Sequence, residues 1–137
     1  MKRYLKGLAA VAAIAAPLAA HHSFSAEYDS KKPVTLKGVV TKVEWMNPHV
    51  YFYIDVTDDK GSTANWGLEM GPPNGLQRSG WTRNTMKIGD EVKVQGNLAK
   101  DGSNLANARF VTLGDGRRLF AGSTTDGGPV APAAGKQ

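Results

Sequence analysis

The chain of 137 residues contains no cysteine, so it can form neither a disulfide bond nor a thiolate metal site. Histidine is scarce, with three residues in all, and aromatic residues make up only 8% of the chain. The one long apolar run, Leu8–Ala16, is too short for a membrane-spanning helix, which needs about 20 residues. A chain of this length and composition is expected to form one domain around a modest apolar core.

The first 20 residues have the layout of a secretory signal peptide. Three positive charges within Lys2–Lys6 come first, the apolar run Leu8–Ala16 follows, and Pro17–Ala20 ends in small residues suited to cleavage after Ala20. We therefore expect a mature protein that is periplasmic or secreted and has no transmembrane segment after processing. An uncleaved N-terminal anchor is the alternative.

The positive charge of the chain belongs partly to this leader. The full chain has a formal net charge of +5, but without residues 1–20 only 14 basic residues face 12 acidic ones. Nucleic-acid-binding domains usually carry a strong basic patch, and this balance does not provide one. Since an exported protein also meets no genomic DNA, we expect no nucleic-acid partner.

Alternating β-branched and aromatic residues predict five strands. The five segments are 34–45, 49–56, 63–70, 90–98 and 106–113. Polar turns at 58–61 and 101–103 join the second strand to the third and the fourth to the fifth. The segment 72–81 has proline at its start and glycine near its end, which predicts one short helix between the third and fourth strands.

This order of elements predicts an all-β protein with one short helix, folded as a five-stranded OB-fold-like barrel. An eight-stranded barrel or a sandwich would need more strands. The barrel is expected to span residues 34–122, between an N-terminal arm (21–33) and a tail (123–137) whose Gly, Pro and Ala content predicts disorder.

The long first strand is expected to bend. Leu36 lies on one phase of the alternation, whereas Val39 and Val43 lie on the other. Gly38 stands at the change, and a glycine inside a strand often marks a bulge or a sharp bend.

The three histidines are the main candidates for chemistry. Cleavage after Ala20 would make His21 the first residue, with an α-amine of pKa about 8 beside its imidazole. These two nitrogens can chelate a metal ion such as copper(II), and His22 or His49 could complete a histidine brace. His49 follows Asn47-Pro48 in a loop that OB barrels use for ligands, and the N-terminal arm is long enough to fold back to it.

Two alternatives to this metal site stay open. Cleavage after Ala19 would place His22 third in the chain, the position for a copper(II) site made of the amine, two amides and an imidazole. Otherwise His21 and His22 are flexible polar residues, and His49 is a hydrogen-bonded surface residue.

A second class of function needs no metal. Tyr51 and Tyr53 point to the same side as His49, and with Asn47 and Met46 of the preceding loop they could form a ligand face. The protein would then be an OB-fold interaction module that binds a peptide, a glycan or a periplasmic protein partner through the face of its first three strands. We expect Trp66 and Trp81 to serve packing instead.

The sequence supports an enzymatic function less well than it supports either binding function. The chain has no cysteine nucleophile and no G-x-S-x-G motif, and the glycine-rich stretch 67–76 lacks the lysine of a phosphate-binding loop. Glu44, Asp55 and Glu69 lie on predicted strands with no evident partner for acid–base work. A copper-dependent oxidase is a third hypothesis, although no substrate platform supports it.

Several stretches together resemble a family of small exported bacterial proteins, a domain of unknown function. They are HHSFSAEYD (21–29), PVTLKGVVTKVEWMNPHV (33–50), NWGLEMGPPNGL (65–76), GWTRNTMKIGD (80–90) and DGSNLANARFVTL (101–113). The resemblance covers nearly all of residues 21–122, and its HHSF and NPH motifs fall on His21–Phe24 and Asn47–His49. It implies an exported, periplasmic OB-like barrel, but it supplies no activity.

Overall fold

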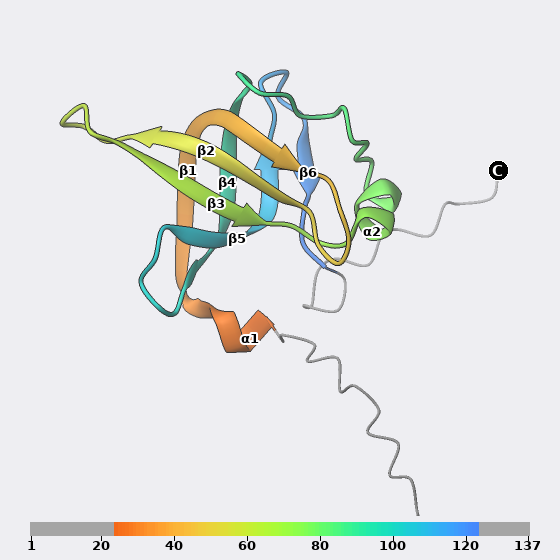
Figure 1. The fold of residues 1–137 in the computed structure, drawn as a ribbon, viewed down its shortest axis with the longest axis horizontal. Helices are drawn as coiled ribbons and strands as arrows, with labels where there is room; N and C mark the ends of the chain where they lie inside the picture. The colour runs from red at the N-terminus through yellow and green to blue at the C-terminus, as the bar shows by residue number, and fades with distance from the viewer. Residues whose placement is uncertain (1–23, 124–137) are drawn as a thin grey trace, which may run out of the picture.

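Six strands and two short helices make up residues 24–123, the part of the chain that the computed structural model describes (Figure 1). In chain order they are α1 (Phe24–Glu27), β1 (Tyr28–Glu44), β2 (Tyr51–Thr57), β3 (Thr63–Glu69), α2 (Pro73–Arg78), β4 (Glu91–Ala99), β5 (Leu105–Thr112) and β6 (Arg118–Phe120). The five predicted strands and the helix between the third and fourth are confirmed.

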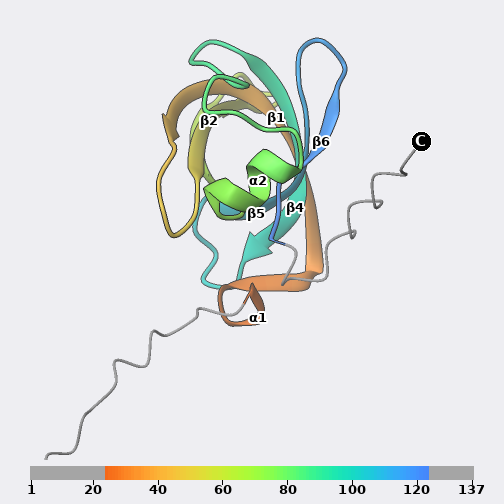
Figure 2. The same ribbon diagram turned by 90° about the vertical axis from the view of Figure 1, so that its right-hand side faces the viewer.

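Five of the strands close into a ring. β1 pairs antiparallel with both β2 and β4, while β3 pairs with β2 and β5 pairs with β4. A parallel pairing between β3 and β5 closes the ring, which is the arrangement of an OB-fold barrel. Figure 2 looks along the barrel, with α2 in front of the ring, and Figure 1 shows that α2 lies at one end of the strands. β6 extends the sheet beside β5. The predicted fold class is therefore confirmed.

The core fills this ring and continues under α2. Phe52 of β2 and Leu68 of β3 are completely buried, as are Val50 just before β2 and Leu76 of α2. Trp81, just beyond α2, is 2% exposed and donates its indole N–H to the carbonyl of Phe120 at 2.8 Å. Trp66 is partly buried and packs against the same core, so the packing role expected for both tryptophans is confirmed.

The first strand departs from the prediction at its start. β1 begins at Tyr28 rather than at residue 34, and Tyr28 pairs with Ala99 of β4. The ladder is then interrupted until Pro33 pairs with Asn97. Residues 28–33, the second half of the segment predicted as an arm, thus form the outer end of β1. The polar sequence of this stretch hid the strand, because alternation is the signal on which the prediction rested.

The bend of β1 also lies elsewhere than predicted. Leu36 and Val40, which share one phase, are both buried, and Val39 is 40% exposed, so the alternation continues past Gly38 unchanged. The register shifts between Val40 and Lys42, so the phase changes at Thr41. Gly38 serves a different purpose, because a Cβ there would lie 2.4 Å from the carbonyl oxygen of Asp55 on β2.

Some predictions fall on residues that the structure does not describe. The signal peptide (1–20), His21 and His22 precede the described part, and residues 124–137 of the predicted tail follow it. Within residues 24–123, no helix has the length and apolar character needed to cross a membrane.

Candidate functional site

The β2–β3 hairpin brings His49, Tyr51 and Glu69 to the outer face of the barrel. Tyr51 pairs directly with Glu69 across the two strands. The pairing continues past the ends of both strands, since the Met70 amide donates to the Val50 carbonyl at 2.8 Å. Val50 and Met70 are both buried, so the alternation of a strand turns their neighbours outward.

The Glu69 carboxylate is the centre of a group of four side chains. The Tyr28 hydroxyl donates to Oε2 of Glu69, and Nδ1 of His49 bonds to Oε1. Tyr51 lies opposite Glu69 on the neighbouring strand, and this carboxylate contributes to raising the pKa of its phenol. The side chain of Glu69 is 11% exposed and that of His49 is 34% exposed. We call Tyr28, His49, Tyr51 and Glu69 the Glu69 cluster.

The two tyrosines of this cluster are hydrogen-bond donors. Burial raises the pKa of Tyr28 far above its ordinary 10.0, and the hydrogen bond to Glu69 and its negative charge add to the effect. The pKa of Tyr51 is raised by the same three causes in the same order. Both phenols therefore keep their protons at neutral pH, which suits them to hold the carboxylate rather than to bind a metal as phenolates.

Glu69 also determines which nitrogen of His49 is available. An ionised carboxylate can only accept hydrogen bonds, so Nδ1 of His49 must carry a proton. The lone pair of a neutral imidazole is then on Nε2, on the other side of the ring. A carboxylate that orients a histidine in this way is the usual second partner of a metal-ligating histidine, although the same contact also ties the β1–β2 loop to β3.

The cluster fixes the N-terminal segment to the barrel. Tyr28 is 3% exposed and reaches Glu69 from the start of β1. The Lys100 amide donates to the carbonyl of Glu27 at 2.9 Å, and the negative charge of Glu27 contributes to the raised pKa of Tyr51. The end of α1 is thus held beside the Glu69 cluster.

Tyr53 belongs to a neighbouring group of side chains. Its hydroxyl donates to Glu44 Oε2 at 3.3 Å, and Lys42 Nζ lies 5.3 Å from the ring centroid. Because a Cβ on Gly67 would lie 3.4 Å from the ring, Tyr53 also covers this glycine on β3. Two neighbours already contact the ring, which leaves it a poor stacking platform for a base or a sugar.

The remaining candidates lie on the β1–β2 loop. Met46 is 55% exposed and Asn47 is exposed, and the peptide bond between Asn47 and Pro48 is cis. The structure therefore brings His49 and Tyr51 together around Glu69, whereas Met46 and Asn47 lie at the surface. His21 and His22 lie outside the described residues.

Sequence reasoning missed the central residue of this site. The sequence indicated no partner for Glu44 or Glu69 in acid–base work, and it gave no sign of the contacts they make. Glu44 pairs with Lys42 and accepts a hydrogen bond from Tyr53.

The sequence held only part of the signal. The turn at 58–61 indicates the β2–β3 hairpin, but counting outward from it would place Leu68 opposite Tyr51. The left-handed Gly61 adds one residue to the turn, so Thr57 pairs with Thr63 and Tyr51 pairs with Glu69.

Within residues 24–123, no group of three or more His, Asp or Glu side chains is placed to hold a metal ion. Protein ligands that join His49 in such a group would therefore lie outside residues 24–123. The expectation of copper binding stays a prediction at this point.

The chain belongs to DUF6152, a family of unknown function whose model matches residues 9–108. No curated protein matches the chain. Among solved structures, the dimeric N-terminal domain of the PriB protein from Thermoanaerobacter tencongensis is similar, at 16% sequence identity and a TM-score of 0.39. The match covers 61% of this chain and 96% of that chain. A likeness at this level says nothing about what the present protein binds.

Proposed function

We propose that this member of the DUF6152 family is an exported protein that binds one copper(II) ion between its mature N-terminus and His49. The observation that carries the proposal is the contact between His49 Nδ1 and the Glu69 carboxylate. This contact leaves Nε2 as the nitrogen able to bind a metal, on a side chain that is 34% exposed.

The other ligands would come from the start of the mature chain. Cleavage after Ala20 gives His21 an α-amine and an imidazole nitrogen, and His22 adds a second imidazole. Copper(II) suits such a set because it binds nitrogen donors more tightly than the other common divalent metals do. The affinity would rise with pH, since the amine and the imidazoles must lose their protons to bind.

The contact of Tyr28 with Glu69 limits how far the N-terminal residues can lie from His49. Tyr28 and His49 both contact Glu69, so the chain before Tyr28 starts close to His49. His21 can lie up to roughly 16 Å from Tyr28, with α1 counted at about 1.5 Å per residue and the rest extended. The proposal requires that a ligand from the N-terminus meets Nε2 of His49 within this reach.

Titration calorimetry of the processed protein with copper(II) tests the proposal. We expect one site, and His49→Ala should weaken it by about 100-fold, because the metal loses a ligand that Glu69 holds in place. Lys60→Ala, in the turn at the other end of the hairpin, should leave the affinity within about twofold. Equal copper affinity of the wild type and His49→Ala would contradict the proposal.

A further inference from the structure

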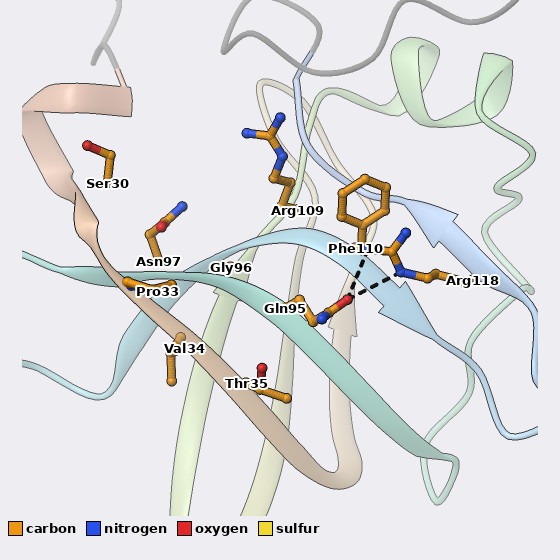
Figure 3. Close-up of a pocket in the computed structure, with 10 residues that line it drawn as sticks. All are labelled: Ser30, Pro33, Val34, Thr35, Gln95, Gly96, Asn97, Arg109, Phe110 and Arg118. Atoms are coloured by element: carbon orange, nitrogen blue, oxygen red, sulfur yellow. Dashed lines mark hydrogen bonds between the residues drawn. The ribbon is translucent and has the colours of Figure 1, made fainter.

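A second site is formed on the outside of the barrel, by residues that are not part of the Glu69 cluster. A groove of about 450 Å³ lies between the outer end of β1, β4, β5 and β6. Figure 3 shows Pro33 and Val34 of β1 on one side and Arg109, Phe110 and Arg118 on the other. The volume is within the range of small-molecule sites.

The groove is positively charged. Arg109 and Arg118 line it, and none of the described residues that line it is acidic. Lys31 and Lys32, which stand between the lining residues Ser30 and Pro33 on β1, are exposed. Because the mature chain has an excess of only two basic residues, this concentration of charge is local.

Arg118 is held in place by neutral partners. Its guanidinium lies 3.7 Å from the centroid of the Phe110 ring, and its Nε and Nη2 both donate to Oε1 of Gln95, at 3.2 and 3.0 Å. Phe110 is itself held by an edge contact with Phe120 at 5.6 Å. A guanidinium fixed in this way loses little conformational entropy when it binds a ligand.

Arg117, the residue before Arg118, has an acidic partner instead of a neutral one. Arg117 donates from Nε to Asp115 Oδ2 at 2.8 Å, so an acid already neutralises it. Gln95 satisfies two of the five N–H donors of Arg118 without cancelling its charge. Three donors therefore remain for a ligand with negative charge.

The uncharged residues of the groove indicate the rest of the ligand. Pro33, Val34 and Phe110 offer apolar surface, and Asn97 and Thr35 offer polar groups beside it. We propose that this groove binds a small organic anion, whose carboxylate or phosphate group pairs with Arg118 and whose apolar body lies along Pro33 and Phe110. This site is independent of copper binding.

Nuclear magnetic resonance titrations of the metal-free protein test this proposal, with benzoate and phenyl phosphate as probes. At least one anion should cause saturable shifts at Gly96, Asn97 and the Arg118 Nε–H, with a dissociation constant of about 1 mM or below. Comparing the two anions distinguishes a carboxylate site from a phosphate site. Neutral benzamide, which has the same ring, should cause no saturable shift.

Two neighbouring substitutions provide a matched pair. Arg118→Gln should weaken anion binding at least about tenfold, since a charge-assisted contact is lost, whereas Arg117→Gln should change it by less than about twofold. Gln95→Glu keeps the contact with Arg118 but neutralises it, so this variant should also weaken binding even if Arg118→Gln does not fold. None of the three should alter copper(II) affinity.

Three results would overturn the anion site. The first is the absence of saturable shifts with both anions. The second is equal binding of benzamide, which would make the groove an apolar surface. The third is an equal loss for Arg117→Gln and Arg118→Gln, which would show a general charge effect.

Discussion

Replacing Glu69 by glutamine will lower the copper(II) affinity of the processed protein by about 10- to 100-fold. The carboxylate can only accept from His49 Nδ1 and so keeps the Nε2 lone pair open. A glutamine amide can instead donate to Nδ1, and the proton then moves to Nε2, where it competes with the metal. Calorimetric titration measures the change.

Glu44→Gln is the matched control for this substitution. Glu44 lies on the same outer face and accepts a hydrogen bond from Tyr53, but it does not belong to the Glu69 cluster. The two variants lose the same charge, so a general electrostatic effect on copper binding would weaken both equally. We expect Glu44→Gln to stay within about twofold of the wild type, and an equal loss in both variants would contradict the role given to Glu69.

The tyrosines report separately on whether Glu69 holds the cluster together. In Glu69→Gln the pKa of Tyr28 and of Tyr51 should fall part of the way toward 10.0, because burial, the largest cause of the increase, remains. In the wild type the raised pKa values favour the folded state. That contribution is complete below pH 10.0 and is lost as the pH rises toward the folded-state values. The ultraviolet absorbance of phenolate follows the change, and an identical titration of both proteins would contradict the arrangement.

Replacing Gly96 by alanine will destabilise the barrel by about 3 kcal/mol or more, or will prevent folding. A Cβ on Gly96 would lie 1.7 Å from the carbonyl oxygen of Asn107 on β5. That backbone cannot easily move away, because Asn107 pairs with Asn97 on β4 and with Glu69 on β3. Urea unfolding measures the loss through the shift of its midpoint.

Gly75→Ala is the matched control, and we expect it to change the stability in the opposite direction. Gly75 lies in α2, and the nearest atom to an added Cβ is 3.6 Å away. Alanine is favoured over glycine in a helix by roughly 1 kcal/mol, so this variant should unfold at a higher urea concentration than the wild type. A midpoint for Gly96→Ala equal to that of the wild type would contradict the close approach of β4 and β5.

Local sequence patterns were sufficient to predict most of the fold. The alternation in 49–56 and 63–70, the turn between them and the proline and glycine around α2 are all short-range signals, and each was read correctly. The outer end of β1 was missed because Asp29–Lys32 has no apolar alternation. The sequence predicts the phase change at Gly38, because a glycine inside a strand often marks a bend. The pairing of β1 with β2 shows that the register shifts at Thr41 instead.

The candidate site could be predicted only in part for a similar reason. The sequence places His49 and Tyr51 on the outer face, since alternation is local. The contact of Tyr28 with Glu69 joins residues 41 positions apart, and it depends on how the start of β1 returns along the barrel. The groove at Arg118 likewise requires the mutual placement of β1, β4, β5 and β6, which no short pattern encodes.

The mass of the intact protein recovered from the periplasm, measured under native conditions, tests the central proposal most directly. It reads the first residue of the mature chain and any bound metal in one experiment. The proposal predicts a chain that begins at His21 and carries one copper ion after exposure to copper(II). A chain that begins at another residue, or one that begins at His21 and takes up no copper, would contradict it.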